Sequence, residues 1–241
     1  IPSYILLLFC TGFIFNVKNY LEKVFNLNER KSKLSNNNKE LFKIVTFSIF
    51  VIILLGTIKF NPSKLNGWRH LYFLYPIIII FCIDGIKFIY KIVKNTLLKK
   101  ILVVICLINI IYLSLWSIYN HPNQYVFFNF ITKNYSVNKF DLDYWGISNL
   151  EAIKFILNES KDKKIKIGTM SFSSLYETTL KLDKKDRKRL KITYNLDDSD
   201  FIINTNMKRF RNNFKIDKIK YIKVFEIKVN NKSINTIYKK I

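Results

Sequence analysis

Apolar positions dominate the first half of the chain, whereas polar and apolar positions alternate only in the second half. Four apolar runs, at about 4–17, 41–58, 71–90 and 101–119, contain few charges. A helix needs about 20 residues to cross the hydrocarbon core of a bilayer. The last three runs approach that length, and the first is expected to be cut short because the chain begins inside it. Runs that are apolar on every face are not typical of surface helices, so the pattern predicts four membrane spans.

Positive charge is shared unequally among the loops that join these runs. The first loop and the third are rich in lysine, whereas the second carries only Lys59, Lys64 and Arg69. Because excess positive charge marks the cytoplasmic side, the second loop and everything after residue 119 are expected outside the cytoplasm. The protein would then lie in a plasma or inner membrane with a periplasmic C-terminal domain. Aromatic residues that would form an interfacial belt cluster at the expected outer ends: Trp68, Tyr72, Tyr75, Trp116, Tyr119 and Tyr125.

A single carboxylate, Asp84, falls within the third run. A charge at that depth is costly and usually faces a protein interior or marks a functional site. Lys87 follows closely, which favours a position near the cytoplasmic end and an ion pair with Lys87 or Lys91. A buried functional acid is the alternative. Pro76, earlier in the same run, is expected to kink or break the helix.

After residue 120 the pattern becomes that of a globular α/β domain with enough residues for its own core. Residues 148–151, with the sequence SNLE, match a capping box in which the Ser148 oxygen accepts a hydrogen bond from the N3 amide. The pattern predicts strands at 164–167, 191–194 and 200–204, short helices at 175–180 and 184–190, and a hairpin from 225 to 238. The predicted fold is therefore an α-helical transmembrane bundle over 1–119, followed by a small extracytoplasmic α/β domain over 120–241.

Charge and cysteine content narrow the function. A formal net charge of +23 would suit nucleic acid, but no arginine-rich arm or aromatic RNA-binding motif is present. Lysine is abundant throughout, so no nucleic-acid partner is expected and anionic membrane lipid is favoured. Cys10, Cys82 and Cys106 lie in apolar runs, which leaves no disulfide framework or CxxC metal site. The outer domain also lacks a glycine-rich phosphate loop, a nucleophile elbow and an HExxH motif.

Three polar residues after the last span are candidates for ligand contact. Asp141 and Asp143 precede the capped helix, and they could bind a divalent cation, position an acceptor hydroxyl or pair with Arg69. Turn formation is the commoner use of such a pair. His121, beside Pro122, could be a further ligand on the outer face or an ordinary loop residue. The sequence indicates no other cofactor.

Two strings are unusual enough to suggest a family. The first is 66–76, NGWRHLYFLYP, at the start of the third span, and the second is 121–129, HPNQYVFFN, followed by FDLDYWG at 140–146. In this order they resemble the C-terminal half of a bacterial membrane family related to protein O-mannosyltransferases and the lipid A aminoarabinose transferase. Those enzymes belong to the GT-C superfamily of glycosyltransferases. The resemblance covers the chain from about residue 65 to the C-terminus.

The resemblance implies a polyprenyl-phosphate-linked sugar as donor and an extracytoplasmic acceptor. It also places the catalytic carboxylate in a first outer loop upstream of this sequence, so the chain is expected to be the C-terminal portion of the enzyme and inactive alone. Arg69 would offer its planar guanidinium to the lipid phosphate, with His70 and Lys64 nearby, while Trp68 and Tyr72 would pack on the prenyl chain or the sugar.

Other roles remain open for the same residues and for the whole chain. Arg69 and Trp68 could simply anchor the end of a helix. The alternative function is that of a non-catalytic membrane protein whose outer domain binds a ligand or a partner. A transporter would need polar or glycine-interrupted spans in repeated pairs, and only Asp84-Gly85 gives a sign of that.

Overall fold

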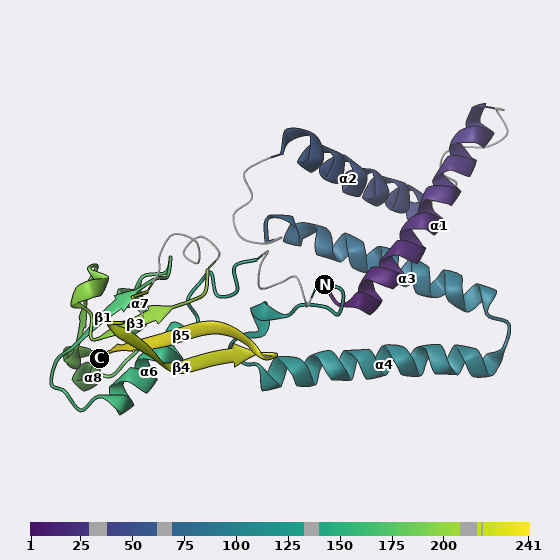
Figure 1. Cartoon of the computed structure of the whole chain (residues 1–241). Helices are drawn as coiled ribbons and strands as arrows, with labels where there is room; N and C mark the ends of the chain where they lie inside the picture. The colour runs from purple at the N-terminus through teal and green to yellow at the C-terminus, as the bar shows by residue number, and fades with distance from the viewer. Residues whose placement is uncertain (29–37, 62–68, 133–139, 208–215, 218) are drawn as a thin grey trace. The chain divides into compact units, whose positions relative to one another are not determined.

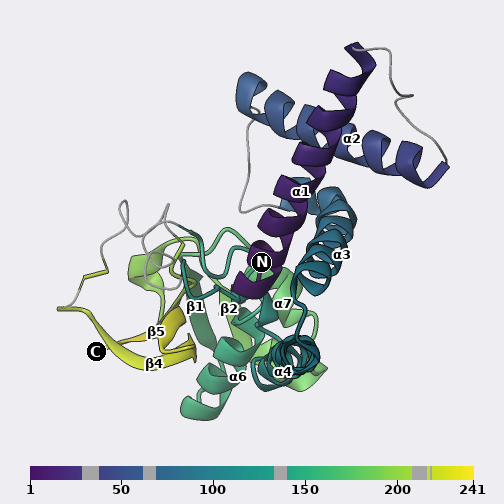
Figure 2. The same cartoon turned by 90° about the vertical axis from the view of Figure 1, so that its right-hand side faces the viewer.

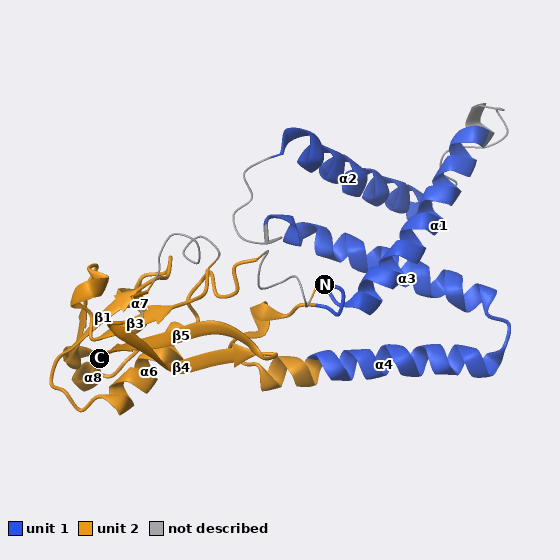
Figure 3. Ribbon diagram, viewed as in Figure 1, with its two compact units in different colours: residues 1–113, 129–131 blue, residues 114–128, 132–241 orange. Residues whose placement is uncertain are grey.

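A computed structural model describes residues 1–28, 38–61, 69–132, 140–207, 216–217 and 219–241 (Figure 1). The chain divides into two compact units (Figure 3). The first comprises 1–113 and 129–131, and the second comprises 114–128 and 132–241. The last turn of the fourth long helix therefore belongs to the second unit, together with the α/β domain.

Long apolar helices make up the first unit. They are α1 (Ser3–Asn28), α2 (Asn38–Phe60), α3 (Tyr75–Ile92) and most of α4 (Thr96–Tyr119). Within the described residues, four helices are long and apolar enough to cross a membrane. Isoleucine, leucine and valine side chains of α4 are broadly exposed, which lipid tolerates and water does not. The prediction of four spans is confirmed, and the chain is a multi-pass membrane protein. The expectation that the first span is cut short is wrong, because the 23 residues Ser3–Phe25 are long and apolar enough to cross a membrane.

Phenylalanine rings from three helices form the core of this unit. Phe9 of α1 and Phe81 of α3 both lie close to Phe50 of α2, with ring centroids 5.5 Å apart in each pair. At their crossing α1 and α3 approach closely at Gly12 and Gly85, where a Cβ atom would collide with backbone of the other helix. Figure 1 shows α1 crossing α3 in this unit, and Figure 2 shows the same helices from a second side. Small residues thus allow the contact, as is common between membrane helices.

Pro76 does not kink a helix, so the expectation that it kinks or breaks the span holds only in that the helical segment changes type beside it. The segment Arg69–Leu74 is a 3-10 helix, η1, and α3 begins only at Tyr75 with Pro76 in its first turn. A proline is well accommodated there because the first amides of a helix have no intrahelical acceptor.

The second unit is built on a five-stranded mixed sheet in the order β2-β1-β3-β5-β4. The strands are β1 (Ile165–Thr169), β2 (Leu190–Ile192), β3 (Phe201–Asn204), β4 (Tyr221–Val229) and β5 (Lys232–Lys240). Strand β1 is parallel to β2 and β3, whereas β5 is antiparallel to β3 and β4. The β4–β5 hairpin turns at Asn230 and Asn231, both at positive φ. The predicted α/β class is confirmed, with longer hairpin strands than the pattern indicated.

Helix α6 (Asn149–Glu159) covers the sheet through one apolar stripe. Its residues Ala152, Ile153, Ile156 and Leu157 are buried in the same core as strand residues such as Ile167. The short helices α7 (Leu175–Thr179) and α8 (Lys184–Arg189) lie between β1 and β2 along the chain.

The capping box predicted for α6 is wrong. Ser148 stands at the N-cap, but its side chain makes no capping hydrogen bond. Its hydroxyl donates instead to the carboxylate of Asp143, five residues earlier. The Ser148 oxygen also accepts a hydrogen bond, but from Nδ2 of Asn235 at 2.9 Å and not from a helix amide, so both the proton and a lone pair of this hydroxyl serve tertiary contacts.

Candidate functional site

The predicted donor-binding residues centre on the 3-10 helix η1. Three residues per turn place Leu71 and Leu74 on one face, where Leu74 is buried and Leu71 packs against the phenylalanine core. His70 and Tyr72 therefore lie on the remaining faces, and both are exposed. The segment is an amphipathic turn whose apolar face anchors it in the helical unit while its polar and aromatic side chains stay accessible.

Three other members of the predicted donor set are not placed. Lys64 and Trp68 lie outside the described residues, as does the side chain of Arg69, whose backbone opens η1. The structure therefore places His70 and Tyr72 on two different faces of η1 and leaves the position of the Arg69 guanidinium a prediction.

Asp143 is fully buried at the centre of a hydrogen-bond network in the second unit. Its Oδ1 accepts from the Tyr125 hydroxyl at 2.6 Å and from the Ile147 amide at 3.0 Å. Its Oδ2 accepts from the amide of Ser148 at 3.1 Å and also from the Ser148 hydroxyl. Four donors satisfy the carboxylate, so Asp143 holds the turn before α6 and fastens it to the segment that follows the last span.

Tyr125 carries the clearest electrostatic signature outside the membrane helices. Burial of its hydroxyl and the neighbouring Asp143 carboxylate raise the pKa of Tyr125 well above its ordinary value. Both influences disfavour the phenolate, so Tyr125 remains a hydrogen-bond donor to Asp143 at any physiological pH. The Tyr125–Asp143 bond thus joins the HPNQY segment to the DLDYWG segment, the two strings that stood out in the sequence.

His121 and Asp141 lie near this network without entering the hydrogen bonds described above. His121 is exposed, and its Nδ1 lies 2.8 Å from Nε2 of Gln124. Asp141 is partly exposed, two residues before the buried Asp143. Among the described residues no three histidine, cysteine, aspartate or glutamate side chains are grouped so as to hold a metal ion. Asp141 is accordingly the better placed of the two aspartates for contact with a ligand.

Asp84 does not pair with Lys87 or Lys91, which corrects the second expectation for the third span. It is buried, with 4% of its surface exposed. Its Oδ1 lies 2.8 Å from Nζ of Lys43 in α2, and its Oδ2 accepts from Nδ2 of Asn16 in α1 at 3.2 Å. The carboxylate therefore links three helices beside the Gly12–Gly85 crossing, and it is compensated inside the unit rather than by a lysine reaching for the interface.

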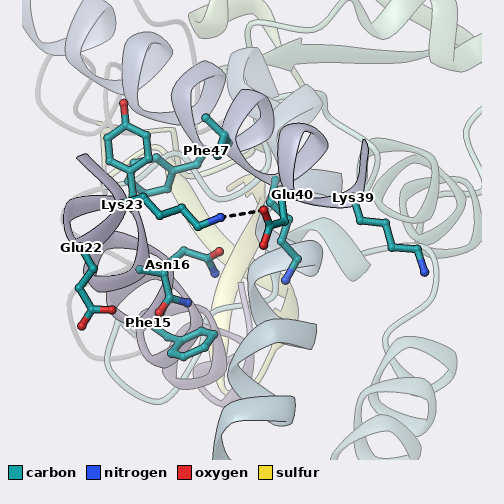
Figure 4. Close-up of a pocket in the computed structure, with 11 residues that line it drawn as sticks. Phe15, Asn16, Glu22, Lys23, Lys39, Glu40 and Phe47 are labelled. Atoms are coloured by element: carbon teal, nitrogen blue, oxygen red, sulfur yellow. Dashed lines mark ion pairs between the residues drawn. The ribbon is translucent and has the colours of Figure 1, made fainter. Parts of the chain in front are cut away.

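A recess of about 570 Å³ opens next to this cluster, between α1 and α2 (Figure 4). Aromatic rings such as Phe15 and Phe47 line it together with charged residues. Lys23 lies 3.0 Å from Glu40 across the recess, and Lys43 is paired with Asp84. Because these charges are balanced in pairs, the recess offers an amphiphilic surface without a concentration of positive charge. It lies at the helix ends that the charge bias predicts to be cytoplasmic.

Sequence reasoning missed Lys43 and Asn16 as partners of Asp84. The available signals were weak: a lone asparagine in an apolar run and a lysine just inside the second span. Sequence reasoning also missed Asn235, whose Nδ2 donates to Oγ of Ser148 at 2.9 Å and to Oδ1 of Asn149 at 3.1 Å. Asn235 lies in a strand whose sequence pattern indicates only a β-hairpin.

Comparison with known proteins adds no relative to this picture. No protein-family model, curated protein or solved structure matches the chain.

Proposed function

We propose that this chain is the C-terminal portion of an integral membrane glycosyltransferase that moves a sugar from a polyprenyl-phosphate donor to an extracytoplasmic acceptor. The observation that carries the proposal is η1. It carries His70 and Tyr72 on an anchored turn at the first residues of the candidate span His70–Ile92, and the proposal places these polar and aromatic groups at headgroup depth. A lipid-linked phosphate has to be bound at that depth, with its prenyl chain in the hydrocarbon region.

Arg69 is the residue that the proposal assigns to the donor phosphate. A guanidinium offers a planar fork of donors that matches phosphate oxygens, and it stays charged at any physiological pH. His70 and Lys64 add donors beside it. Trp68 and Tyr72 pack on the prenyl chain or on the sugar. The scarcity of lysine in the second loop supports an extracytoplasmic position for this group and for the α/β domain.

The chemical step is assigned to a carboxylate outside this sequence, in an earlier outer loop. Asp143 does not take that role in the proposal, because its carboxylate is occupied by four donors. The α/β domain then serves the acceptor, with Asp141 and His121 as its candidate polar contacts.

Turnover by the full-length protein tests the proposal. Arg69→Ala should lower sugar transfer from a polyprenyl-phosphate donor by about a hundredfold or more, as loss of a charge-assisted phosphate contact does. Arg69→Lys should recover only part of it, because a lysine lacks the planar fork. Lys59→Ala removes a positive charge from the end of α2 on the same expected face and serves as the control. Unchanged transfer in Arg69→Ala would remove Arg69 from the site.

A non-catalytic membrane protein with a ligand- or partner-binding outer domain is the second candidate. It is favoured by the exposed aromatic residues of the second unit, among them Trp145 and Phe172. An acidic residue in the first outer loop of the full-length chain, together with measurable sugar transfer, would decide for the transferase. Ligand binding without any transfer would decide for the second candidate.

A further inference from the structure

Four segments of the second unit contain no lysine or arginine, although the chain carries 40 such residues. They are 141–149, 167–180, 201–207 and 233–238. Within the α/β domain the stretches 120–132 and 192–200 also lack both residues, whereas strands β4 and β5 carry lysine outside these limits. The four segments are distant in sequence, so their shared composition becomes informative only if the fold brings them together.

Hydrogen bonds join these four segments in a closed ring. Asn149 Nδ2 donates to Ser173 Oγ at 3.1 Å, and Asn235 Nδ2 donates to Ser148 Oγ at 2.9 Å. The Phe172 amide contacts the sulfur of Met207 at 3.4 Å. Asn206 Nδ2 closes the ring by donating to Ser233 Oγ at 2.9 Å. The four segments without lysine or arginine therefore gather at one place in the second unit.

That place is the carboxyl end of the parallel strands. The segment 170–173 directly follows β1, and 205–207 directly follows β3. From β1 the chain passes to β2 on one side, whereas from β3 it continues toward β4 and β5 on the other. In open sheets with parallel strands, ligands bind outside the carboxyl ends at the point where the connections diverge in this way.

Two buried polar atoms at this place have no hydrogen-bond partner among the described residues. They are Oγ1 of Thr205 and Oδ1 of Asn235, and both residues are fully buried. An unpaired polar atom in such a position costs stability, so native proteins generally supply a partner, whether protein, water or ligand. Their coincidence with the ring gives a second and independent reason to look for a ligand there.

Aromatic rings lie on the outer side of the same segments. The Tyr144 ring stacks on Phe172 with centroids 5.4 Å apart, and Trp145 meets Tyr144 edge to face at 5.0 Å. Trp145 and Phe172 are 54% and 57% exposed. Trp145 and Phe172 are thus held in place by Tyr144 while each remains more than half exposed.

We propose that this surface binds a neutral saccharide. Aromatic faces stack on the C–H faces of a pyranose ring, and side-chain amides and hydroxyls match its hydroxyl groups. An anionic ligand would find no lysine or arginine in the four segments, and Asp143 beneath them is already occupied. In the transferase, the bound saccharide would be the acceptor of the transferred sugar. This role as acceptor rests on the proposed transferase function, whereas saccharide binding itself does not.

Saccharide binding to the full chain in lipid nanodiscs tests the proposal. The probes are the neutral trisaccharides maltotriose, mannotriose and chitotriose, with anionic trigalacturonate for comparison, followed by saturation-transfer NMR and titration. At least one neutral probe should bind, and Trp145→Ala and Phe172→Ala should each weaken it by about tenfold or more. Trp145→Phe should retain most of the affinity. Tyr194→Ala is the matched control, because Tyr194 is an aromatic residue of the same unit that is 98% exposed and lies outside the four segments.

Three results would overturn the proposal. The first is that none of the neutral trisaccharides binds, and the second is that Tyr194→Ala weakens binding as much as Trp145→Ala. The third is that brominated lipids strongly quench the fluorescence of Trp145, identified as the part of the signal that is lost in Trp145→Phe. Such quenching would mean that the rings face the membrane. The binding experiment contains no sugar donor, so it does not depend on the transferase function. If saccharide binding is intact but the full-length protein transfers no sugar, only the proposed transferase function is contradicted.

Discussion

Nζ of Lys43 lies 2.8 Å from Oδ1 of Asp84, so an ion pair joins the start of α2 to the interior of α3. Asn16 of α1 binds the other carboxylate oxygen. Helices α1, α2 and α3 of the first unit therefore meet at one polar cluster within an otherwise apolar core. A buried carboxylate that loses its partner is destabilising, so removing Lys43 should lower the free energy of unfolding measurably.

Lys43→Met is expected to destabilise the helical unit by about 1–3 kcal/mol. The value lies below that of a fully buried pair because the Lys43 side chain is 45% exposed. Thermal unfolding in detergent measures the effect. Lys39→Met, on the same helix, is the control and should unfold like the wild type. Equal melting temperatures for Lys43→Met and Lys39→Met would show that the pair contributes nothing.

The crossing of α1 and α3 predicts a strict requirement for glycine. A Cβ atom on Gly12 would collide with the carbonyl oxygen of Phe81, and one on Gly85 would collide with that of Leu8. Gly12→Ala and Gly85→Ala should each cost about 1–3 kcal/mol, because backbone has to move. Gly56→Ala, where nothing lies within 4 Å, should be neutral or slightly stabilising. Melting curves of the three variants compare them, and a loss in Gly56→Ala equal to the others would contradict the close approach.

Length and hydropathy are local properties, which is why the spans could be predicted from sequence while the partner of Asp84 could not. Lys43 is 41 positions away, and only the packing of α2 against α3 brings it to Asp84. Lys87 and Lys91 were predicted as partners because they are close to Asp84 in sequence, but the packing of three helices provides Lys43 and Asn16 instead. The strands and the hairpin followed in the same way from local alternation, whereas their order in the sheet did not.

The polar residues of the outer domain show the same limit. The SNLE pattern at 148–151 fits a capping box, yet the Ser148 hydroxyl donates to Asp143 and its oxygen accepts from Asn235, two partners that only the tertiary fold brings near. Asp141 and Asp143 look equivalent in sequence, and burial alone separates them. In contrast, the exposure of His70 and Tyr72 follows from a local rule, once the three-residue period of η1 is known.

Tyr125→Phe tests the bond that holds the two unusual strings together. Loss of a hydrogen bond to a buried carboxylate should destabilise the second unit by about 1 kcal/mol, a modest value because the Tyr125 ring is partly exposed. Near-ultraviolet circular dichroism during thermal unfolding of the full chain reports it. An unchanged melting transition at neutral pH would contradict the role of Tyr125 in this turn.

The same tyrosine predicts a dependence on alkaline pH. Folding raises the pKa of Tyr125, so the unfolded chain releases this proton first. The stability from this group is fully present below the unfolded tyrosine pKa of about 10 and is lost as the pH rises above it. Tyr125→Phe should therefore flatten the decline in melting temperature above that pH. A residual decline is expected, because folding also raises the pKa values of Tyr221 and Tyr238.

Labelling of introduced cysteines tests the orientation that the loop charges predict. Tyr194→Cys, in the second unit, should react with a membrane-impermeant maleimide added outside intact cells. Lys39→Cys, at the start of α2, should react only after the membrane is opened. The wild type gives the background from Cys10, Cys82 and Cys106. The opposite pattern would place the α/β domain in the cytoplasm and remove the acceptor role proposed for it.

Binding of the lipid donor is the most direct test of the glycosyltransferase account, because it requires neither the acceptor nor the catalytic carboxylate. The chain in nanodiscs is titrated with a polyprenyl phosphate and with the matching polyprenol, and retained lipid is counted by native mass spectrometry. The account predicts that the phosphate binds about tenfold or more tightly than the alcohol, and that Arg69→Ala abolishes this difference while Lys59→Ala keeps it. Equal binding of the two lipids, or a preference for phosphate that survives Arg69→Ala, would contradict it.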